Sequence, residues 1–123
     1  MTSPGLQGKH ILLVDDEGAV RAATRMLLEV DGHTVVEAEG GARALELLEA
    51  DGFDLVITDF RMSGIDGGQL TVRIKQATPQ KPVIILTAWP ADVTPEIPAD
   101  QILAKPYTLN ELRQTIARVL ELH

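Results

Sequence analysis

Three aspartates stand after short apolar runs, where a parallel sheet would gather them. Asp15 and Asp16 follow the run at 11–14, and Asp59 follows the run at 55–57 after one threonine. Carboxyl ends of neighbouring parallel strands meet at one edge of a sheet, so the three carboxylates are expected to lie close together. Bare carboxylates repel and raise one another's pKa values, and a hard cation relieves that repulsion. An all-oxygen site that keeps some waters predicts Mg²⁺, with Mn²⁺ as a second candidate.

Two other runs end in a hydroxyl and in an ammonium group. Thr87 follows the apolar run at 83–86, and Lys105 follows the run at 102–104. A carboxylate beside a cation and an ammonium group is equipped to attack phosphorus, because both positive charges offset charge on the transferring oxygens. Asp59 is the predicted nucleophile, Lys105 is its counter-ion, and Thr87 is placed to donate a hydrogen bond to a bound phosphoryl group.

The same residues have simpler interpretations. Asp15 and Asp16 could cap a helix that starts at Glu17, where negative charge is also favourable. A strand-end threonine such as Thr87 is common on its own. The joint occurrence of the acidic pair with Asp59 and a lysine favours the metal-assisted site over capping.

The elements that must position these residues follow from the apolar pattern. Short solid runs alternate with longer stretches of helical spacing, which predicts repeated βα units. Runs that are apolar on both faces belong inside a parallel sheet covered by helices on both faces, and right-handed crossovers predict a doubly wound α/β sheet. The expected strands are residues 11–14, 34–36, 55–57, 83–86 and 102–104.

Glycine and capping residues mark the ends of several expected helices. Gly32 follows an expected helix at the position where a residue with left-handed backbone conformation commonly ends the helix. Asp66 with Gln69 is a candidate helix cap. Thr108 with Glu111 has the spacing of a capping box.

Two segments depart from the βα pattern. Residues 88–99 contain three prolines, so the fourth helix is expected to be short or distorted. Residues 1–8 are expected to form a disordered leader, which leaves residues 9–123 as one domain.

Composition excludes several classes of protein. A chain of 123 residues can bury one core, and the absence of cysteine excludes disulfides and thiolate metal sites. The net charge of -7 disfavours direct binding to nucleic acid or to anionic lipid. The apolar runs are too short to span a bilayer and no signal peptide is apparent, so a soluble cytoplasmic protein is expected.

Four segments, in order and approximate spacing, resemble the signatures of bacterial two-component response regulator receiver domains: ILLVDDE, DLVITDFRMSGIDG, ILTA and LAKPY. The resemblance runs from about Lys9 to Leu122. It implies a flavodoxin-like sheet of five strands in the order 2-1-3-4-5. In that family the phosphoryl donor is the phosphohistidine of a histidine kinase or phosphotransfer protein, and the receiver catalyses its own phosphorylation and dephosphorylation.

The resemblance assigns roles to the acidic residues. Asp59 corresponds to the phosphoacceptor, and Asp15 and Asp16 correspond to the acidic pair that binds Mg²⁺. Arg61 takes the position that supplies a backbone carbonyl to the metal. These assignments agree with the chemistry expected from the residue types.

The resemblance extends to the switch residues, with one departure. Thr87 and Lys105 correspond to the switch hydroxyl and the lysine of the family, and the bond from Lys105 to Pro106 would be cis. The usual switch aromatic is replaced by Ile102, and Tyr107 is a family aromatic at a different position. The usual coupling of threonine to a rotating aromatic is therefore not expected.

Residues that flank the expected site are candidates for modulating it. Arg61 and Trp89 could screen a phosphoryl group from water and so set its lifetime, with the small Ala88 next to the switch hydroxyl. Trp89 could equally be a partly exposed surface aromatic. Ser63 replaces a frequent proline of the family in the turn after Asp59.

Two classes of function fit these observations. The first is a phosphoacceptor switch of a two-component phosphorelay, either stand-alone or part of a hybrid histidine kinase, acting as a monomer or weak dimer on an unidentified downstream protein. The second is a phosphorylation-independent docking module. A nucleotide triphosphatase would need a G-x-x-x-x-G-K-[ST] loop, and an aspartyl phosphatase would need a second acid at Arg61.

Overall fold

The computed structural model describes residues 8–50 and 52–121, which form alternating strands and helices. The leader expected over residues 1–8 lies outside the described residues except for Gly8. The elements in chain order are β1 (His10–Val14), α1 (Gly18–Val30), β2 (Thr34–Ala38), α2 (Gly41–Ala50), β3 (Leu55–Asp59), α3 (Gly67–Ala77), β4 (Val83–Thr87), the 3₁₀ turn η2 (Pro90–Asp92), β5 (Gln101–Ala104) and α4 (Leu109–Glu121).

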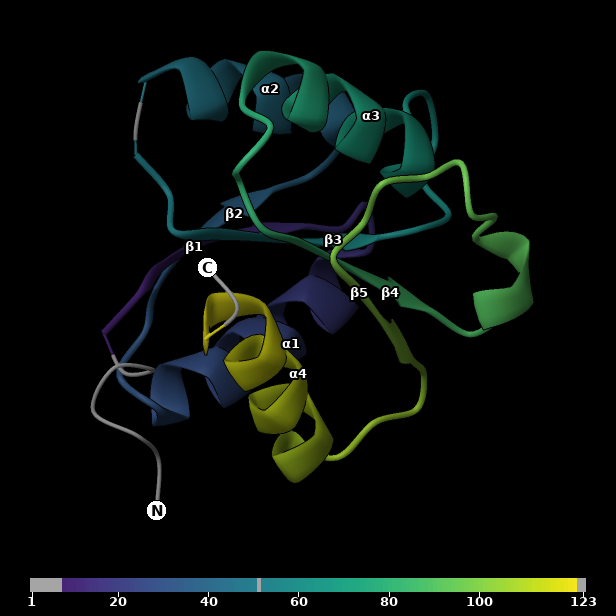
Figure 1. The fold of residues 1–123 in the computed structure, drawn as a ribbon. Coiled ribbons are helices and arrows are strands. Elements are labelled where there is room, and N and C mark those ends of the chain that lie inside the picture. The colour runs from purple at the N-terminus through teal and green to yellow at the C-terminus, as the bar shows by residue number, and fades with distance from the viewer. Residues whose placement is uncertain (1–7, 51, 122–123) are drawn as a thin grey trace.

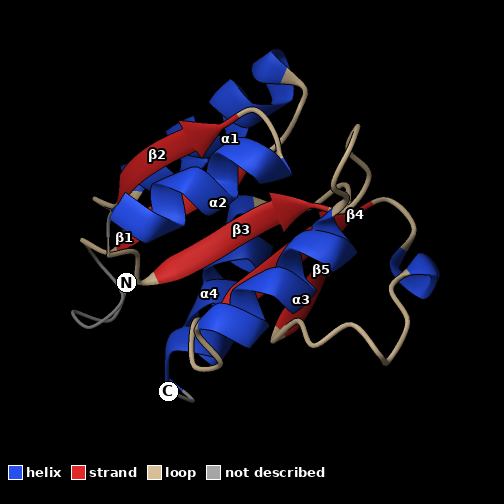
Figure 2. Cartoon of the chain, turned by 90° about the horizontal axis from the view of Figure 1, so that it is seen from above, coloured by secondary structure: helices blue, strands red, loops and turns tan. Residues whose placement is uncertain are grey.

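The five strands form one parallel sheet in the order β2-β1-β3-β4-β5, which confirms the predicted topology. Helices α1 and α4 cover one face, and α2 and α3 cover the other (Figure 1). Seen from above, the strands run in the same direction (Figure 2). The carboxyl ends of all five strands therefore lie along one edge, where the predicted site residues follow them.

Strand β1 contributes side chains to two separate cores, because successive side chains of a strand point to opposite faces of the sheet. Ile11 and Leu13 of β1 pack with residues of α1 and α4, whereas Leu12 and Val14 pack with residues of α2 and α3. All four side chains are buried. The continuous apolar runs seen in the sequence are thus required by burial on both faces.

The fourth helix of the expected pattern is reduced to η2, a single turn. Proline starts this turn at its first position, and the described chain then continues without a helix to β5. Figure 1 shows the turn, in green, standing away from both helical layers. The segment is attached to the core through Val93 and Ile97, which pack on the α2 and α3 side. The prediction of a short or distorted fourth helix is confirmed.

The helix ends also follow the sequence. The Asp66 carboxylate accepts the Gln69 backbone N–H at 2.8 Å, and the Gln69 side chain accepts the Asp66 N–H at 3.0 Å. Thr108 and Glu111 make the equivalent pair before α4. Gly32 has a φ of 79°, the left-handed conformation expected there. In the part of the chain that the structure describes, no helix is long and apolar enough to cross a membrane.

His33 is expected to make stability depend on pH. Burial lowers the pKa of His33, the nearby Asp31 charge opposes this, and the Lys9 charge adds to it. Its Nδ1 accepts the Lys9 backbone N–H at 3.2 Å. The unfolded chain binds the proton more readily, so the free energy of unfolding is expected to fall as pH drops below about 6.5, until the folded-state pKa is passed.

The His33→Asn variant isolates this contribution, because asparagine keeps an acceptor near the position of Nδ1 but does not titrate. Urea unfolding at pH 7.5 and at pH near 5.5 should give a smaller loss of stability for the variant than for the wild type. Equal losses would assign the pH dependence to other groups.

Candidate functional site

The two acidic strand ends lie next to each other at the carboxyl edge of the sheet. Strands β1 and β3 are hydrogen-bonded neighbours, with Val14 opposite Thr58. The residues that follow, Asp15 and Asp59, are therefore adjacent, and both are buried, with 4% and 9% of their surface exposed. The structure thus brings together carboxylates that are 44 positions apart in the sequence.

A nearby backbone N–H holds the Asp15 carboxylate, and neighbouring charged groups shift its pKa. Its Oδ1 accepts the Glu17 backbone N–H at 2.9 Å. Burial raises the pKa of Asp15, the hydrogen bond from Glu17 opposes the rise, and the charges of Asp59 and Asp16 add to it, partly offset by Lys105. The capping interpretation is wrong about the helix start, because α1 begins at Gly18 with Glu17 at its N-cap, and the N–H that Asp15 accepts is that of Glu17 itself.

Asp16 is exposed and links two loops. Its Oδ2 accepts the backbone N–H of Ser63 at 3.0 Å, which joins the loop after β1 to the loop after β3. The backbone oxygen of Asp15 accepts a hydrogen bond from Arg21 of α1 at 2.6 Å. These contacts hold the loop after β1, which carries Asp15 and Asp16, against the edge of the sheet.

Lys105 is the direct partner of Asp59. Its Nζ forms an ion pair with Oδ1 of Asp59. The Lys105 backbone N–H donates to the Thr87 carbonyl at 2.8 Å, so the end of β5 is fixed to the end of β4. The bond between Lys105 and Pro106 is cis, as the resemblance implied. The ammonium group is thus positioned to offset negative charge at Asp59.

Thr87 ends β4 and is buried, with its hydroxyl at the same edge. Its Oγ1 accepts the Trp89 backbone N–H at 3.0 Å across the exposed Ala88. A hydroxyl can accept one hydrogen bond and donate another, so Thr87 can also donate to a group in the pocket. A cavity of about 290 Å³ is lined by Glu17, Asp59, Arg61, Thr87, Ala88, Trp89 and Lys105.

Arg61 and Trp89 form one wall of this cavity. The Arg61 guanidinium carbon lies 4.5 Å from the centre of the Trp89 ring, in cation–π contact. The same guanidinium donates to Oδ2 of Asp92 in η2 at 2.5 Å. Trp89 is 56% exposed, so it is a partly exposed aromatic, and it also lines the Asp59 cavity.

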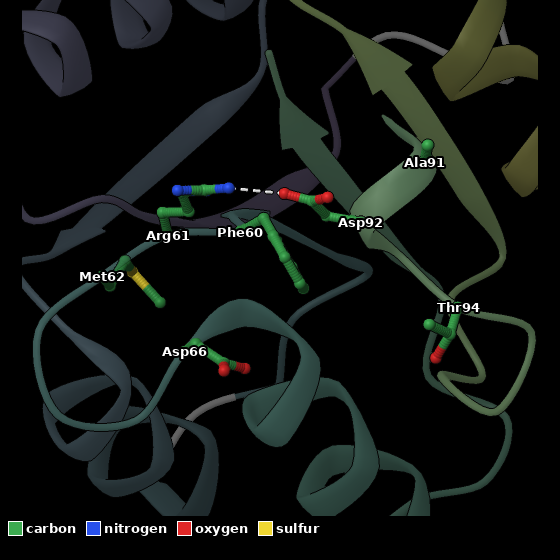
Figure 3. A pocket seen from close by; sticks show the side chains of 7 residues that line it. All are labelled: Phe60, Arg61, Met62, Asp66, Ala91, Asp92 and Thr94. Atoms are coloured by element: carbon green, nitrogen blue, oxygen red, sulfur yellow. Dashed lines mark hydrogen bonds and ion pairs between the residues drawn. The ribbon is translucent and has the colours of Figure 1, made fainter. Parts of the chain in front are cut away.

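A second cavity, of about 630 Å³, also has Arg61 in its lining. Figure 3 shows Arg61 and Asp92 reaching toward each other over it, from the loop after β3 and from η2. Its lining residues are Phe60, Arg61, Met62, Asp66, Ala91, Asp92 and Thr94. Arg61 therefore lines both the Asp59 cavity and a hollow that is also lined by Ala91 and Asp92 of η2.

Two residues tied to the switch in the sequence lie outside the cavity. Ile102 is on β5 and is 39% exposed. The Tyr107 hydroxyl is hydrogen-bonded to the Thr24 hydroxyl of α1 at 3.0 Å, and its ring packs on the α1 and α4 core. Tyr107 is thus fixed on the α1 side and does not take the place of a switch aromatic at Ile102.

Sequence reasoning missed two residues of this region, Glu17 and Asp92. Glu17 follows the acidic pair directly, so its position was a usable signal. Asp92 lies in the proline-rich segment and pairs with a residue 31 positions away, which no local pattern indicates.

The residues present fit a hard divalent cation. The available ligands are carboxylate and backbone oxygens, the donors that Mg²⁺ prefers. The negative charges of Asp59 and Asp16 repel that of Asp15 and contribute to its raised pKa. A bound cation would relieve this repulsion. Among residues 8–50 and 52–121, no three acidic or histidine side chains already converge as a metal cluster. Asp16 is instead turned to a backbone N–H and Asp59 to Lys105.

Comparison with known proteins gives a consistent match. The family model described as response regulator receiver domain matches residues 11–117. Transcriptional regulatory protein GlrR of Escherichia coli (strain K12) is 39% identical over 117 residues, which cover 91% of this chain and 26% of that protein. Sensor kinase CckA of Brucella abortus (strain 2308) is 35% identical over 117 residues, which cover 90% of this chain and 12% of that protein.

Solved structures match over almost their full length. Response regulator protein TrrA from Thermotoga maritima, in complex with Mg²⁺-BeF, has a TM-score of 0.83 and 31% identity, covering 91% of this chain and 99% of that chain. A putative response regulator from Chloroflexus aurantiacus has a TM-score of 0.86 and 29% identity, covering 94% and 99%. The chain spans about a quarter of the length of GlrR.

Proposed function

Because this chain belongs to the response regulator receiver domains of two-component signalling, we propose that it is a phosphoacceptor switch whose acceptor is Asp59. The observation that carries the proposal is the buried Asp59 carboxylate in a cavity with the Lys105 ammonium and the Thr87 hydroxyl. This combination is suited to phosphoryl transfer, in which positioning and charge stabilisation supply most of the catalysis.

The reaction uses groups that the chain holds in place. An Asp59 carboxylate oxygen attacks the phosphorus of a phosphohistidine, the P–O bond forms and the P–N bond breaks, and the leaving imidazole nitrogen keeps the electron pair and takes up a proton. Lys105 offsets charge on the phosphoryl oxygens, and the Thr87 hydroxyl donates to one of them. The Arg61 and Trp89 wall limits the approach of water to the acyl phosphate, whereas the small Ala88 side chain leaves the opening beside Thr87 unobstructed.

The metal ligands in this proposal are the carboxylates of Asp15, Asp16 and Asp59 and the backbone carbonyl of Arg61, holding Mg²⁺ or, as a second candidate, Mn²⁺. When bound, the cation supplies positive charge to the phosphoryl oxygens. The TrrA structure, a complex with Mg²⁺-BeF, supports the choice of metal by similarity.

The proposed partners are a histidine kinase or phosphotransfer protein as donor and a further protein that reads the switch. Relatives include proteins named as transcriptional regulators and a sensor kinase, so the downstream step depends on the protein in which the domain works. With a net charge of -7, the domain is proposed to act on proteins and not directly on nucleic acid or membranes. The reduction of the fourth helix to η2 favours a monomer or weak dimer, and a cytoplasmic location fits a kinase partner.

The proposal is tested by incubating the protein with acetyl phosphate, with Mg²⁺ and after its removal by EDTA, and reading covalent phosphorylation by intact mass. One phosphoryl group per chain is expected with Mg²⁺ and none without it. The absence of an adduct, sampled fast enough to catch a short-lived acyl phosphate, would favour the phosphorylation-independent docking module instead.

Replacing Lys105 by Met should change metal binding and phosphorylation in opposite directions. Without the ammonium group, the Asp59 and Asp15 carboxylates lack a counter-charge, so Mg²⁺ is expected to bind more tightly. The transferring oxygens lose their positive partner, and phosphorylation should slow by about a hundredfold. Calorimetric titration with Mg²⁺ and timed intact-mass measurements report the two effects.

Lys9→Met is the matched control, because Lys9 precedes β1 at the opposite edge of the sheet. It should leave both quantities unchanged. A joint fall in Mg²⁺ affinity and phosphorylation rate in Lys105→Met would mean that Lys105 acts by holding the structure together.

A further inference from the structure

One side chain lines both cavities at the carboxyl edge of the sheet. Arg61 belongs to the wall of the Asp59 cavity and to the wall of the hollow beneath η2. It stacks on Trp89 within the first and forms an ion pair with Asp92 over the second. Arg61 therefore borders both the expected phosphorylation site and the segment that replaces the fourth helix.

We propose that Arg61 transmits the state of Asp59 to the η2 segment by exchanging its Asp92 partner for the phosphoryl group. This inference rests on the proposed function and adds a positioning role for Asp92. Before phosphorylation, Asp92 holds Arg61 over the hollow and Arg61 holds η2. After phosphorylation, the guanidinium turns to the phosphoryl oxygens and Asp92 loses its partner.

The strengths of the competing contacts favour this exchange. The side chains of Arg61 and Asp92 are 62% and 43% exposed, and ion pairs between exposed side chains contribute little to stability. A phosphoryl group carries a charge of about -1.5 to -2 and offers three acceptor oxygens, which arginine binds in bidentate geometry. Trp89 lines the Asp59 cavity as well, so the stacking contact can accompany the guanidinium as it turns.

The η2 turn is attached to the site at both of its ends. At its start, the Trp89 backbone N–H donates to the Thr87 hydroxyl, and at its last residue Asp92 binds Arg61. Both partners, Thr87 and Arg61, line the Asp59 cavity. A phosphoryl group that engages Arg61 withdraws the anchor at the last residue of the turn, while the Thr87 hydroxyl can donate to the same group and still accept the Trp89 N–H. This gives the domain an output route that does not need an aromatic residue at Ile102.

A double-mutant cycle tests the exchange with beryllofluoride, an analogue of the phosphoryl group, in the presence of Mg²⁺. Affinity is measured by calorimetry for the wild type, Asp92→Asn, Arg61→Gln and the double variant. If Asp92 competes for Arg61, Asp92→Asn should bind the analogue about threefold more tightly. In the Arg61→Gln background the same substitution should have no effect, because the competition has been removed.

Glu96→Gln is the matched control for charge. Glu96 is an exposed acid of the same segment, and its pKa is lowered by the Thr94 hydroxyl, so its partner is local. Removing its charge should leave affinity for the analogue unchanged. Two outcomes would assign the effect to general charge repulsion and overturn the exchange. One is an equal gain in affinity for beryllofluoride in Glu96→Gln and Asp92→Asn. The other is an equal gain in affinity from Asp92→Asn in the wild-type and Arg61→Gln backgrounds.

Hydrogen exchange measures the release of the turn directly. The backbone N–H groups of Asp92 and Val93 donate to Trp89 and Pro90 within the turn, and their exchange should speed up when beryllofluoride binds the wild type. Unchanged exchange would overturn the transmission to η2. Incubation with acetyl phosphate distinguishes failure of the proposed function from failure of this inference. No adduct in the wild type would overturn the proposed function. An adduct in the wild type, together with a double-mutant cycle that shows no coupling between Arg61 and Asp92, would overturn only the role of these two residues.

Discussion

Asp59→Asn should abolish covalent phosphorylation and leave the fold in place. The amide is close in shape to the carboxylate and still accepts a hydrogen bond from Lys105, but its oxygen is a far weaker nucleophile than a carboxylate oxygen. Intact mass after incubation with acetyl phosphate and Mg²⁺ should show no adduct. Circular dichroism and urea unfolding should show a folded domain, so the loss is chemical.

The control for this substitution lies at the other end of the same strand. Asp54 directly precedes β3 and accepts the His10 backbone N–H at 2.8 Å, whereas Asp59 ends β3. Asp54→Asn keeps that acceptor and removes the same charge, so its adduct should equal that of the wild type. An adduct that persists in Asp59→Asn would move the acceptor to another carboxylate, of which the buried Asp15 is nearest in the sheet.

Gly67→Ala should destabilise the domain by about 2–3 kcal/mol and disturb the site, through overpacking. A Cβ at Gly67 would lie 2.3 Å from the Asp59 carbonyl oxygen and 2.8 Å from the Phe60 Cα. Both neighbours are backbone atoms at the end of β3, and the Gly67 N–H already donates to the Phe60 carbonyl at 2.7 Å. The methyl group can be accommodated only by moving the chain that carries Asp59.

Urea unfolding and the rate of phosphorylation should therefore both change in this variant. Gly40→Ala is the comparison, since a Cβ there meets nothing within 4 Å and Gly40 directly precedes the start of α2, much as Gly67 lies at the start of α3. It should alter the free energy of unfolding by no more than about 0.5 kcal/mol. A similarly small change in Gly67→Ala would mean that the start of α3 can withdraw from β3 without cost.

Much of the architecture could be predicted because burial on both faces leaves a direct mark on the sequence. Runs such as residues 11–14 and 83–86 have no polar member, which only a strand between two helical layers requires. Once the strands and the right-handed crossovers are known, the residues after them must share one edge. The adjacency of Asp15 and Asp59 followed from this, as did the placement of Lys105 near them.

Contacts that depend on loop backbone or on long side chains could not be predicted in the same way. The bond from the Ser63 N–H to Asp16 depends on how two loops fold over the sheet edge. The pairing of Arg61 with Asp92 depends on the path of a proline-rich segment that has no periodicity. The roles of the site residues in metal binding and phosphoryl transfer are predictions that the experiments described above test.

Trp89 is the only tryptophan of the chain, and the Arg61 guanidinium is stacked on its ring. The emission of the indole therefore comes from one place, the wall of the Asp59 cavity. A change in the position of the guanidinium alters the electric field at the ring, so the intensity or wavelength of the emission should follow the chemical state of the site. The domain thus contains its own optical reporter, and the kinetics of switching can be recorded in stopped-flow experiments on the unlabelled protein.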